Sequence, residues 1–200
     1  MASQWGHPSP AKSVSRRRVS PLCERGFTLA EVAVTIMILA ILAVTFTPKI
    51  TDALARIRVN AAAQKLVADI RFTRDLSLSK HATYGLEFNT GGNFYQLFSV
   101  SGGTKTVIMN PHKGVAMTVD YDDLPEFGGT TMGSMGNICT DTNQCDTKEL
   151  RVDAFGTPRD RLNAAFTETV TIVLQNGSFS RTVRVTPETG FTCLSGETNC

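Results

Sequence analysis

The sequence predicts an α+β protein in which a long N-terminal α-helix is packed on an antiparallel β-sheet head. Three observations support this prediction. Residues 27–47 form an apolar run with a single charged residue, and residues 49–84 contain neither proline nor glycine. After residue 83, apolar and polar residues alternate with the period of two that is typical of strands. A helical run followed by a run of strands is the pattern of an α+β chain.

The apolar run is long enough to cross a membrane. Its 21 residues, Phe27 to Thr47, make a helix of about 31 Å at about 1.5 Å per residue, close to the hydrocarbon thickness of a bilayer. The apolar core of a secretory signal peptide has about 7–15 residues, so this run is too long for one. Glu31 is the exception within the run, and an acid at depth in a membrane costs on the order of 2.5 kcal/mol or more. We therefore expect Glu31 to be functional and to need a cationic partner.

The start of this run resembles the processing site of a known family. Residues 26–31, Gly-Phe-Thr-Leu-Ala-Glu, are similar to the prepilin peptidase site of type IV pilins and pseudopilins, which is cut after the glycine. Pro48 stands at position 22 from Phe27, where that family commonly has a proline. The resemblance implies cleavage after Gly26, N-methylation of Phe27, and pairing of Glu31 with the terminal amine of a neighbouring subunit during filament assembly.

The chain is expected to divide into a cytoplasmic leader (residues 1–26, removed), a transmembrane helix (27–47), a periplasmic half of the same helix (48–82) and a β-rich head (83–200). The leader is rich in arginine, which predicts that the N-terminus stays inside and the head is translocated across the bacterial inner membrane. The formal charge of the whole chain is +2. Removal of the leader, with five basic and one acidic residue, leaves 15 basic and 17 acidic residues, so a general attraction to nucleic acid is not indicated.

Beyond Pro48 the helix is predicted to become amphipathic. Apolar residues recur at helical spacing in two sets, one formed by Leu54, Ile57 and Ala61, the other by Ala62, Leu66, Ile70 and Thr73. The polar residues that we expect to face away are Arg56, Asn60, Lys65, Asp69 and Arg74. With the span, this predicts one helix of about fifty residues whose second half lies against a sheet.

The head is predicted to contain two clear hairpins. Residues 84–88 and 94–100 alternate on either side of a Thr-Gly-Gly-Asn turn, and residues 170–174 and 179–185 alternate on either side of Asn176-Gly177, a preferred hairpin turn. Shorter strands are expected at residues 106–109, 115–119 and 150–152. Residues 120–149 show little periodicity and are expected to form a long irregular loop.

The second half of the head is similar to the C-terminal region of the GspH/FimT pseudopilin group. The similarity rests on Phe155-Gly156-Thr157-Pro158, a strand, the Asn-Gly turn, and residues 181–190, Arg-Thr-Val-Arg-Val-Thr-Pro-Glu-Thr-Gly. It implies a minor pseudopilin of a type II secretion pseudopilus, with a FimT-like minor pilin of a type IV pilus, priming assembly or binding DNA in uptake, as the alternative. The implied partners are prepilin peptidase, other pilins or pseudopilins in a helical filament, and an inner-membrane assembly platform.

Four cysteines remain after the leader is removed, in two couples: Cys139 with Cys145, and Cys193 with Cys200. In an oxidising periplasm this usage favours two disulfides that close short loops, although three connectivities are formally open. Zinc is the rival reading, but neither spacing is the two-residue hook common in zinc sites. No metal and no cofactor is therefore expected.

Three further groups of residues are candidate sites: two histidines, a cluster of aspartates and two arginines. His81 and His112 have no neighbouring nucleophile in a recognisable setting, so no enzymatic activity is expected. The cluster Asp120, Asp122 and Asp123 lacks the spacing of a calcium loop and is expected to be a solvated loop. Arg181 and Arg184 are the candidate DNA contacts, but no Lys or Arg follows Gly190, so DNA binding is not favoured. Both are expected to be exposed arginines on the last hairpin.

Overall fold

The computed structural model describes residues 26–110, 114–138 and 148–196. The chain divides into two compact units, residues 1–43 and 44–200, and each is described by itself. Helix α1 (Leu29–Lys80, 52 residues) contributes to both. The first unit, in its described part, consists of residues 26–28 and the start of this helix, and the second is the head.

The predicted helix of about fifty residues is confirmed, and its C-terminal end is closed by a left-handed residue. His81 follows the last helical residue with φ 49°, and the Ala82 N–H donates to the carbonyl of Ser77 at 3.3 Å. This is the bond pattern of a Schellman cap, in which the left-handed position is usually glycine. His81 is exposed, so its role in the described structure is that of a helix cap.

Replacing His81 with glycine is expected to stabilise the protein. A left-handed conformation is unfavourable for residues with a side chain, and glycine adopts it without this cost. We expect a gain of about 0.5–1 kcal/mol in the free energy of unfolding, measured by denaturant titration of the full chain in detergent. His81→Ala is the matched control and should give no gain, because alanine keeps the Cβ atom. A loss of stability in the glycine variant would contradict the assignment.

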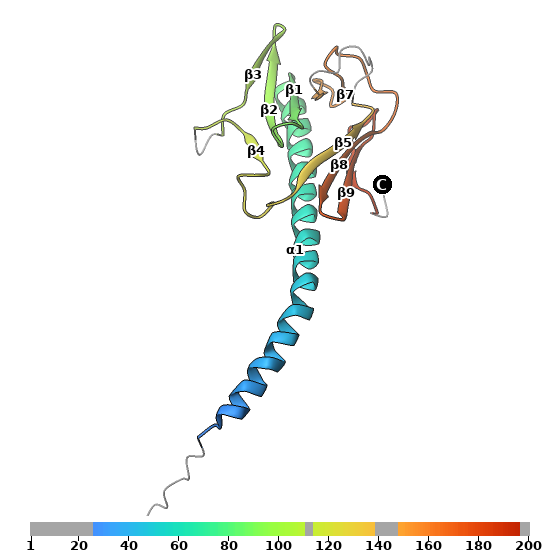
Figure 1. Ribbon diagram of the computed structural model, residues 1–200. Helices are drawn as coiled ribbons and strands as arrows, with labels where there is room; N and C mark the ends of the chain where they lie inside the picture. The colour runs from blue at the N-terminus through green and yellow to red at the C-terminus, as the bar shows by residue number, and fades with distance from the viewer. Residues whose placement is uncertain (1–25, 111–113, 139–147, 197–200) are drawn as a thin grey trace, which may run out of the picture. The chain divides into compact units, whose positions relative to one another are not determined.

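The first sheet is antiparallel and contains the predicted N-terminal hairpin. Its order is β3-β2-β1-β6-β7, with β4 also paired to β2. The bounds are β1 Thr83–Asn89, β2 Phe94–Ser101, β3 Thr104–Val107, β4 Thr118–Asp120, β6 Lys148–Val152 and β7 Pro158–Arg159. In Figure 1, β2 and β3 lie on one side of the head part of α1, and β8 and β9 lie on the other.

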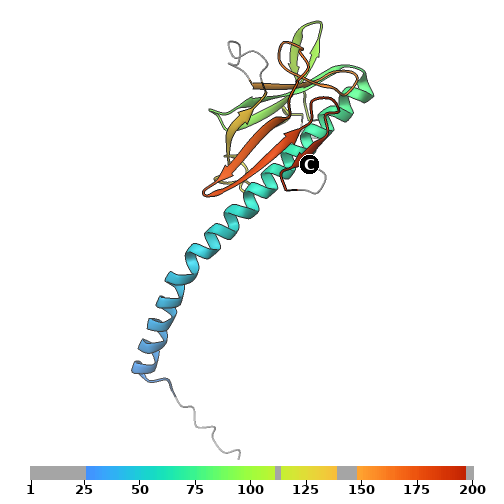
Figure 2. The same cartoon turned by 90° about the vertical axis from the view of Figure 1, so that its right-hand side faces the viewer.

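The second sheet has the order β10-β9-β8-β5 and is also antiparallel. Its bounds are β5 Thr131–Gly136, β8 Val170–Asn176, β9 Phe179–Val185 and β10 Thr192–Leu194. Asn176 pairs with Phe179 across the Asn-Gly turn, which confirms the second predicted hairpin. Figure 2 shows β8 and β9 running beside the helix.

Strand β5 lies within residues 120–149, where an irregular loop was expected, so that prediction was wrong for this part. The strand reads Thr-Met-Gly-Ser-Met-Gly and shifts register between Met132 and Met135, which removes the alternation that would have revealed it. A Cβ atom at Gly136 would lie 2.6 Å from Thr171 Oγ1 on β8. Glycine at this position therefore allows β5 and β8 to approach closely. The composition of the segment, taken alone, indicates a loop and not a strand.

The head core forms between the helix and both sheets. Helix residues Val59, Leu66 and Ile70 are almost fully buried. They belong to one apolar cluster with Leu86, Leu97, Leu150, Ile172, Leu174 and Val183 from the strands. This confirms that the second half of the helix lies against sheet.

The predicted division of helix faces was partly wrong. Leu54 is 43% exposed and Ile57 62% exposed, although both were assigned to the apolar face. Asp69, which was expected to face solvent, is 6% exposed and accepts a hydrogen bond from the Tyr95 hydroxyl at 2.7 Å. The physical reason is that α1 carries two apolar stripes, and the head covers the one centred on Leu66.

Polar contacts fix the helix to both sheets. The Ser77 hydroxyl donates to the Val152 carbonyl of the first sheet at 3.2 Å. The Arg71 guanidinium donates to the Thr192 carbonyl of the second sheet at 2.6 Å. Burial raises the pKa of the Tyr95 hydroxyl well above its ordinary value, and the neighbouring Tyr121 and Asp69 raise it further. Tyr95 therefore stays a neutral donor to the Asp69 carboxylate.

Candidate processing and assembly site

The N-terminal motif lies at the exposed start of α1. Gly26, Phe27 and Thr28 precede the helix, which begins at Leu29. The Thr28 hydroxyl accepts a hydrogen bond from the Glu31 N–H at 3.2 Å, and the Thr28 carbonyl accepts bonds from the N–H groups of Glu31 and Val32, both at 3.1 Å. Thr28 is thus the N-cap of the helix, and it separates a non-helical Gly-Phe junction from the regular helix.

The capping role of Thr28 was not assigned from the sequence, although a signal for it was present. Thr28 and Glu31 stand three positions apart directly before an apolar run, which is the spacing of a capping box. This spacing places Glu31 in the first helical turn. The unpaired N–H groups there carry partial positive charge and favour a carboxylate.

Nothing in the described structure requires glycine at position 26. Gly26 is exposed, and a Cβ atom built there would meet no atom within 4 Å. Its φ is not among the positive values found in the described residues. The steric freedom at this position is therefore available to a partner that approaches the backbone closely.

The helix that follows presents apolar side chains outward. Phe27 is 80% exposed and Leu29 is 88% exposed. Among the described residues, α1 is the one helix that is long enough and apolar enough to cross a membrane. No residue in its most apolar stretch is buried. The start of α1 therefore exposes an apolar surface whose contact with water is unfavourable. Glu31 is the acidic residue in the first turn of this helix.

Several predicted residues lie outside what the structure describes. Pro48 lies within α1, but its side chain is not described. Cys139, Cys145 and Cys200 are outside the described residues, while Cys193 lies on β10 and is 3% exposed. The two disulfides remain predictions. His112 is also outside.

The two arginines considered for DNA binding differ in their surroundings. The Arg181 guanidinium Nε donates to the Asn60 side-chain oxygen on α1, so it joins the second sheet to the helix and is half-buried. Arg184 is exposed and lines a pocket with Thr171 and Thr186. The reading of both as exposed surface residues was therefore wrong for Arg181, because the helix lies beside that edge of the hairpin.

The acidic cluster is engaged with neighbouring groups of the head. The Asp120 carboxylate accepts a bond from the Asp122 N–H at 2.9 Å, and the Asp122 carboxylate accepts one from the Asn93 side-chain amide at 2.9 Å. Asn93 in turn joins this loop to β5 through the Met132 N–H at 2.8 Å. Within the described residues these carboxylates organise a loop.

The two C-terminal turns that carry the GspH/FimT similarity meet in space. A Cβ atom at Gly190 would lie 2.9 Å from the Gly156 carbonyl oxygen and 3.3 Å from Arg74 Cδ. Gly156 and Gly190 both have positive φ, 83° and 63°. These glycines let two turns distant in sequence pack on the end of α1.

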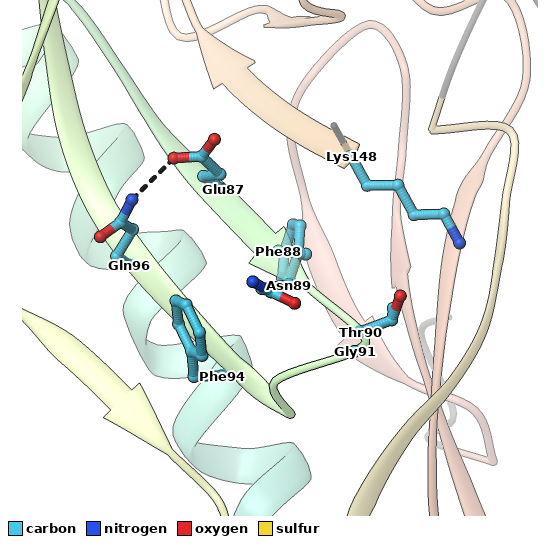
Figure 3. Close-up of a pocket in the computed structure, with 8 residues that line it drawn as sticks. All are labelled: Glu87, Phe88, Asn89, Thr90, Gly91, Phe94, Gln96 and Lys148. Atoms are coloured by element: carbon cyan, nitrogen blue, oxygen red, sulfur yellow. Dashed lines mark hydrogen bonds between the residues drawn. The ribbon is translucent and has the colours of Figure 1, made fainter. Parts of the chain in front are cut away.

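A polar pocket of about 380 Å³ lies beside the turn between β1 and β2. Figure 3 shows Glu87, Gln96 and Phe94 on one side of it, and Lys148 pointing away from Glu87. The Gln96 amide donates to the Glu87 carboxylate at 2.7 Å, and the Lys105 ammonium donates to its other oxygen at 2.7 Å. The Glu87 carboxylate, one of the two charged groups that line this pocket, is therefore already held by neighbouring strands.

Glu87 belongs to an ion network across the outer face of the first sheet. The Glu149 side chain is 2% exposed; it accepts a bond from Lys105 Nζ at 2.9 Å and from Arg151 Nη2 at 2.8 Å. The Lys105 ammonium also lies 5.0 Å from the centre of the Phe98 ring. The network joins β3, β1 and β6, which are separate in sequence.

Replacing Glu149 with alanine is expected to destabilise the head strongly. Removal of the Glu149 carboxylate takes away the ion-pair partner of Arg151 and leaves Lys105 with Glu87 alone. Because Glu149 is buried, we expect a loss of about 3 kcal/mol in the free energy of unfolding. Denaturant titration of the full chain measures it. Lys148→Ala, at the neighbouring position on the same strand, is the control, and we expect a change within about 0.5 kcal/mol. Equal effects of the two substitutions would refute the role of the network.

Low pH is expected to lower the stability of the head through the carboxyl groups of Glu87 and Asp153. Burial alone would raise the pKa of Glu87, but hydrogen bonds from Lys105 and Gln96 outweigh it and lower that pKa. Burial alone would likewise raise the pKa of Asp153. Hydrogen bonds from Arg159 and from the backbone N–H groups of Thr157 and Phe155 outweigh this effect and lower that pKa. Because both values are lower in the folded state, their stabilisation is present above the ordinary carboxyl pKa of about 4 and is lost as the pH falls through the folded values.

The measurement is the melting temperature of the full chain in detergent between about pH 6 and pH 2.5, a range that spans the ordinary carboxyl pKa values. We expect a decline that begins near the ordinary carboxyl pKa and that becomes shallower in the double variant Glu87→Gln, Asp153→Asn. An unchanged slope in the double variant would show that other groups cause the decline.

Residues 22–47 match a family model described as the prokaryotic N-terminal methylation motif, and no curated protein matches the chain. The type IV minor pilin FimU of Pseudomonas aeruginosa is 14% identical, with 68% of this chain and 87% of that chain covered and a TM-score of 0.44. The minor pseudopilin EpsH from the type 2 secretion system of Vibrio cholerae is 14% identical, with 70% and 99% covered and a TM-score of 0.49.

The matched segment contains the Gly-Phe junction, the Thr28 cap, Glu31 and the exposed apolar helix described above. The resemblance predicted from residues 26–31 is thereby confirmed. In the structure, this motif is an exposed Gly-Phe junction directly before a helix that Thr28 caps. The chain carries the prokaryotic N-terminal methylation motif at residues 22–47.

Proposed function

We propose that this protein is a minor pseudopilin, a structural subunit of a type II secretion pseudopilus. Prepilin peptidase cleaves it after Gly26, and Phe27 is then N-methylated. The observation that carries the proposal is the match of residues 22–47 to the methylation motif, at an exposed junction directly before an apolar helix. The mature chain enters a filament through this helix.

Membrane and filament are two environments that cover the same apolar surface. Before assembly, lipid surrounds the helix, the leader is cytoplasmic and the head is periplasmic. After assembly, helices of neighbouring subunits replace the lipid. Glu31 favours the second environment, because the terminal amine of a neighbouring Phe27 supplies the cation that an intramembrane carboxylate lacks.

The alternative is a FimT-like minor pilin of a type IV pilus, which would use the same motif and helix. A DNA-binding version draws little support from the head. Arg181 is bonded to Asn60, which leaves Arg184 as the exposed member of the pair, and affinity for DNA grows with the number of phosphates contacted. We therefore keep the structural role as the proposal.

The test is the N-terminal mass of the chain in cells with and without prepilin peptidase. With the enzyme, we expect the membrane and filament fractions to contain a chain that starts at methylated Phe27. Without it, the chain should keep its leader and stay in the membrane. Recovery with a secretion pseudopilus supports the proposal, recovery with a type IV pilus supports the alternative, and an unprocessed chain in both strains excludes both.

A further inference from the structure

Two arginines lie near the C-terminal end of α1 without a carboxylate partner. Arg71 and Arg74 are three residues apart, a spacing that makes side chains neighbours on one face of a helix. The Arg71 guanidinium donates to the backbone carbonyl of Thr192 at 2.6 Å. The Nε atom of Arg74 is buried and has no hydrogen-bond partner within the described residues. No ion pair in the described part of the chain includes either arginine.

The acids close to this pair in the chain do not neutralise it. Asp75 stands four residues after Arg71, at the spacing of a helical ion pair, yet it is exposed and no ion pair joins the two side chains where the structure describes them. Glu188 is also exposed, and Asp153 is held by Arg159 at 2.7 Å. A half-buried guanidinium without an anion is costly. A ligand that supplies a carboxylate would remove this cost.

Two glycine turns hold Arg74 in place. A Cβ atom at Gly156 would lie 3.4 Å from Arg74 Nε, and one at Gly190 would lie 3.3 Å from Arg74 Cδ. Both glycines have left-handed φ values, which a residue with a side chain adopts only at a cost. The turns can therefore approach the arginine closely. A guanidinium that is fixed before its ligand arrives loses less conformational entropy on binding.

An exposed phenylalanine lies beside each of these glycines. Phe155, directly before the first glycine, is 87% exposed, and Phe191, directly after the second, is 44% exposed. Their backbones are held in position: the Phe155 N–H donates to the Asp153 carboxylate at 2.9 Å, and the Phe191 carbonyl accepts a bond from the Thr186 N–H at 2.9 Å. Aromatic residues and arginine are enriched where proteins bind one another. The two rings and the two arginines therefore have the composition of a protein contact.

We propose that Arg71, Arg74, Phe155 and Phe191 bind a segment of a partner protein that carries a carboxylate beside an apolar side chain. A planar guanidinium binds a carboxylate through two parallel hydrogen bonds, and the rings offer apolar surface to the side chain next to it. Two arginines reach few phosphates, and affinity for DNA grows with their number, so a protein is the favoured partner. The inference concerns a partner of the head and does not require cleavage after Gly26.

Fluorine NMR of the full chain in detergent tests this site. 4-Fluorophenylalanine replaces Phe191 as the reporter, and in a second sample it replaces Phe94, at the start of β2, as the control. The probe is the dipeptide N-acetyl-leucyl-phenylalanine with a free carboxylate, and its C-terminal amide reports partition into the detergent. We expect a saturable shift at position 191 with the acid, no such shift with the amide, and none at position 94. Equal shifts with acid and amide, or at both positions, would overturn the proposal.

Substitutions test the two arginines and the rings separately from the fold. Arg74→Gln should weaken binding of the acid at least about tenfold, because a neutral amide replaces the charged fork, and Arg74→Lys should bind with an intermediate affinity, because it keeps only the charge. Phe155→Ser should weaken binding at an unchanged melting temperature, because its side chain is exposed. Leu162→Ser, an exposed apolar residue elsewhere in the head, is the matched control and should bind as wild type does.

The melting temperature of each variant separates a lost ligand contact from a damaged fold. If Arg74→Gln fails to fold, Phe155→Ser and the comparison of acid with amide in the wild-type chain decide the question. Wild-type affinity in both Arg74→Gln and Phe155→Ser would overturn the proposal. A saturable shift at position 191 with a thymidine oligonucleotide, and none with the acid, would overturn it in favour of nucleic acid.

Discussion

Replacement of Gly26 by alanine abolishes maturation, and the chain accumulates with its leader attached: this is the largest effect that we expect. The cause does not lie in the fold, because Gly26 is exposed and a Cβ atom there would meet nothing within 4 Å. It lies in the peptidase, whose reacting groups must approach the backbone on both sides of the bond to be cut. A displacement of about 1 Å at a reacting centre can cost about a hundredfold in rate.

Pulse labelling followed by N-terminal mass measurement gives the processed fraction with time. The matched control is Gly91→Ala, since the φ of Gly91 is not among the positive values and a Cβ atom there makes only an ordinary 3.5 Å contact. This control should be processed at the wild-type rate. A Gly26→Ala chain that starts at Phe27 in normal yield would remove the cleavage assignment.

Features encoded by neighbouring residues could be predicted from the sequence. The apolar run, the residues without proline or glycine after it, and the Asn176-Gly177 turn each determine local structure, and α1 and the β8–β9 hairpin follow them. The methylation motif was predictable for the same reason, because its residues are contiguous in the chain. Its cap was also signalled locally, by the spacing of Thr28 and Glu31.

Features that depend on distant partners could not be predicted. Two apolar stripes on α1 are equivalent by periodicity, and only the position of the sheets shows that Leu66 is covered and Ile57 is not. Asp69 resembles a solvent-facing acid until Tyr95 is placed against it. Glu149 is buried because Lys105, 44 positions earlier in the chain, lies across the sheet from it.

The exposed apolar residues of α1 give the chain a reason to associate. The apolar cluster of the head includes one face of α1, whereas other apolar side chains of this helix are exposed, among them Ile36, Met37 and Ile57. A large exposed apolar surface on a protein marks a site of contact with a membrane or with another protein. Association through α1 therefore follows from the same hydrophobic term that forms the core.

Replacement of Glu31 by alanine is expected to separate processing from assembly. The Thr28 hydroxyl bonds the backbone N–H of residue 31 and not its carboxylate, so the helix start should persist in the variant and cleavage after Gly26 should continue. What is lost is the carboxylate that we propose to pair with the terminal amine of a neighbouring Phe27. Close charge pairs at interfaces have coupling energies of about 1.5–7 kcal/mol, and each 1.4 kcal/mol is about tenfold.

We therefore expect a Glu31→Ala chain that is cleaved normally and is recovered in filaments at least about tenfold less than wild type. Quantitative immunoblotting of sheared filaments against the membrane fraction measures this ratio. Asp52→Ala is the matched control, because Asp52 is an exposed acid on the same helix outside the apolar run; its incorporation should be unchanged. If Glu31→Ala enters filaments as Asp52→Ala does, the carboxylate has no part in assembly, and the apolar surface of α1 must suffice for it.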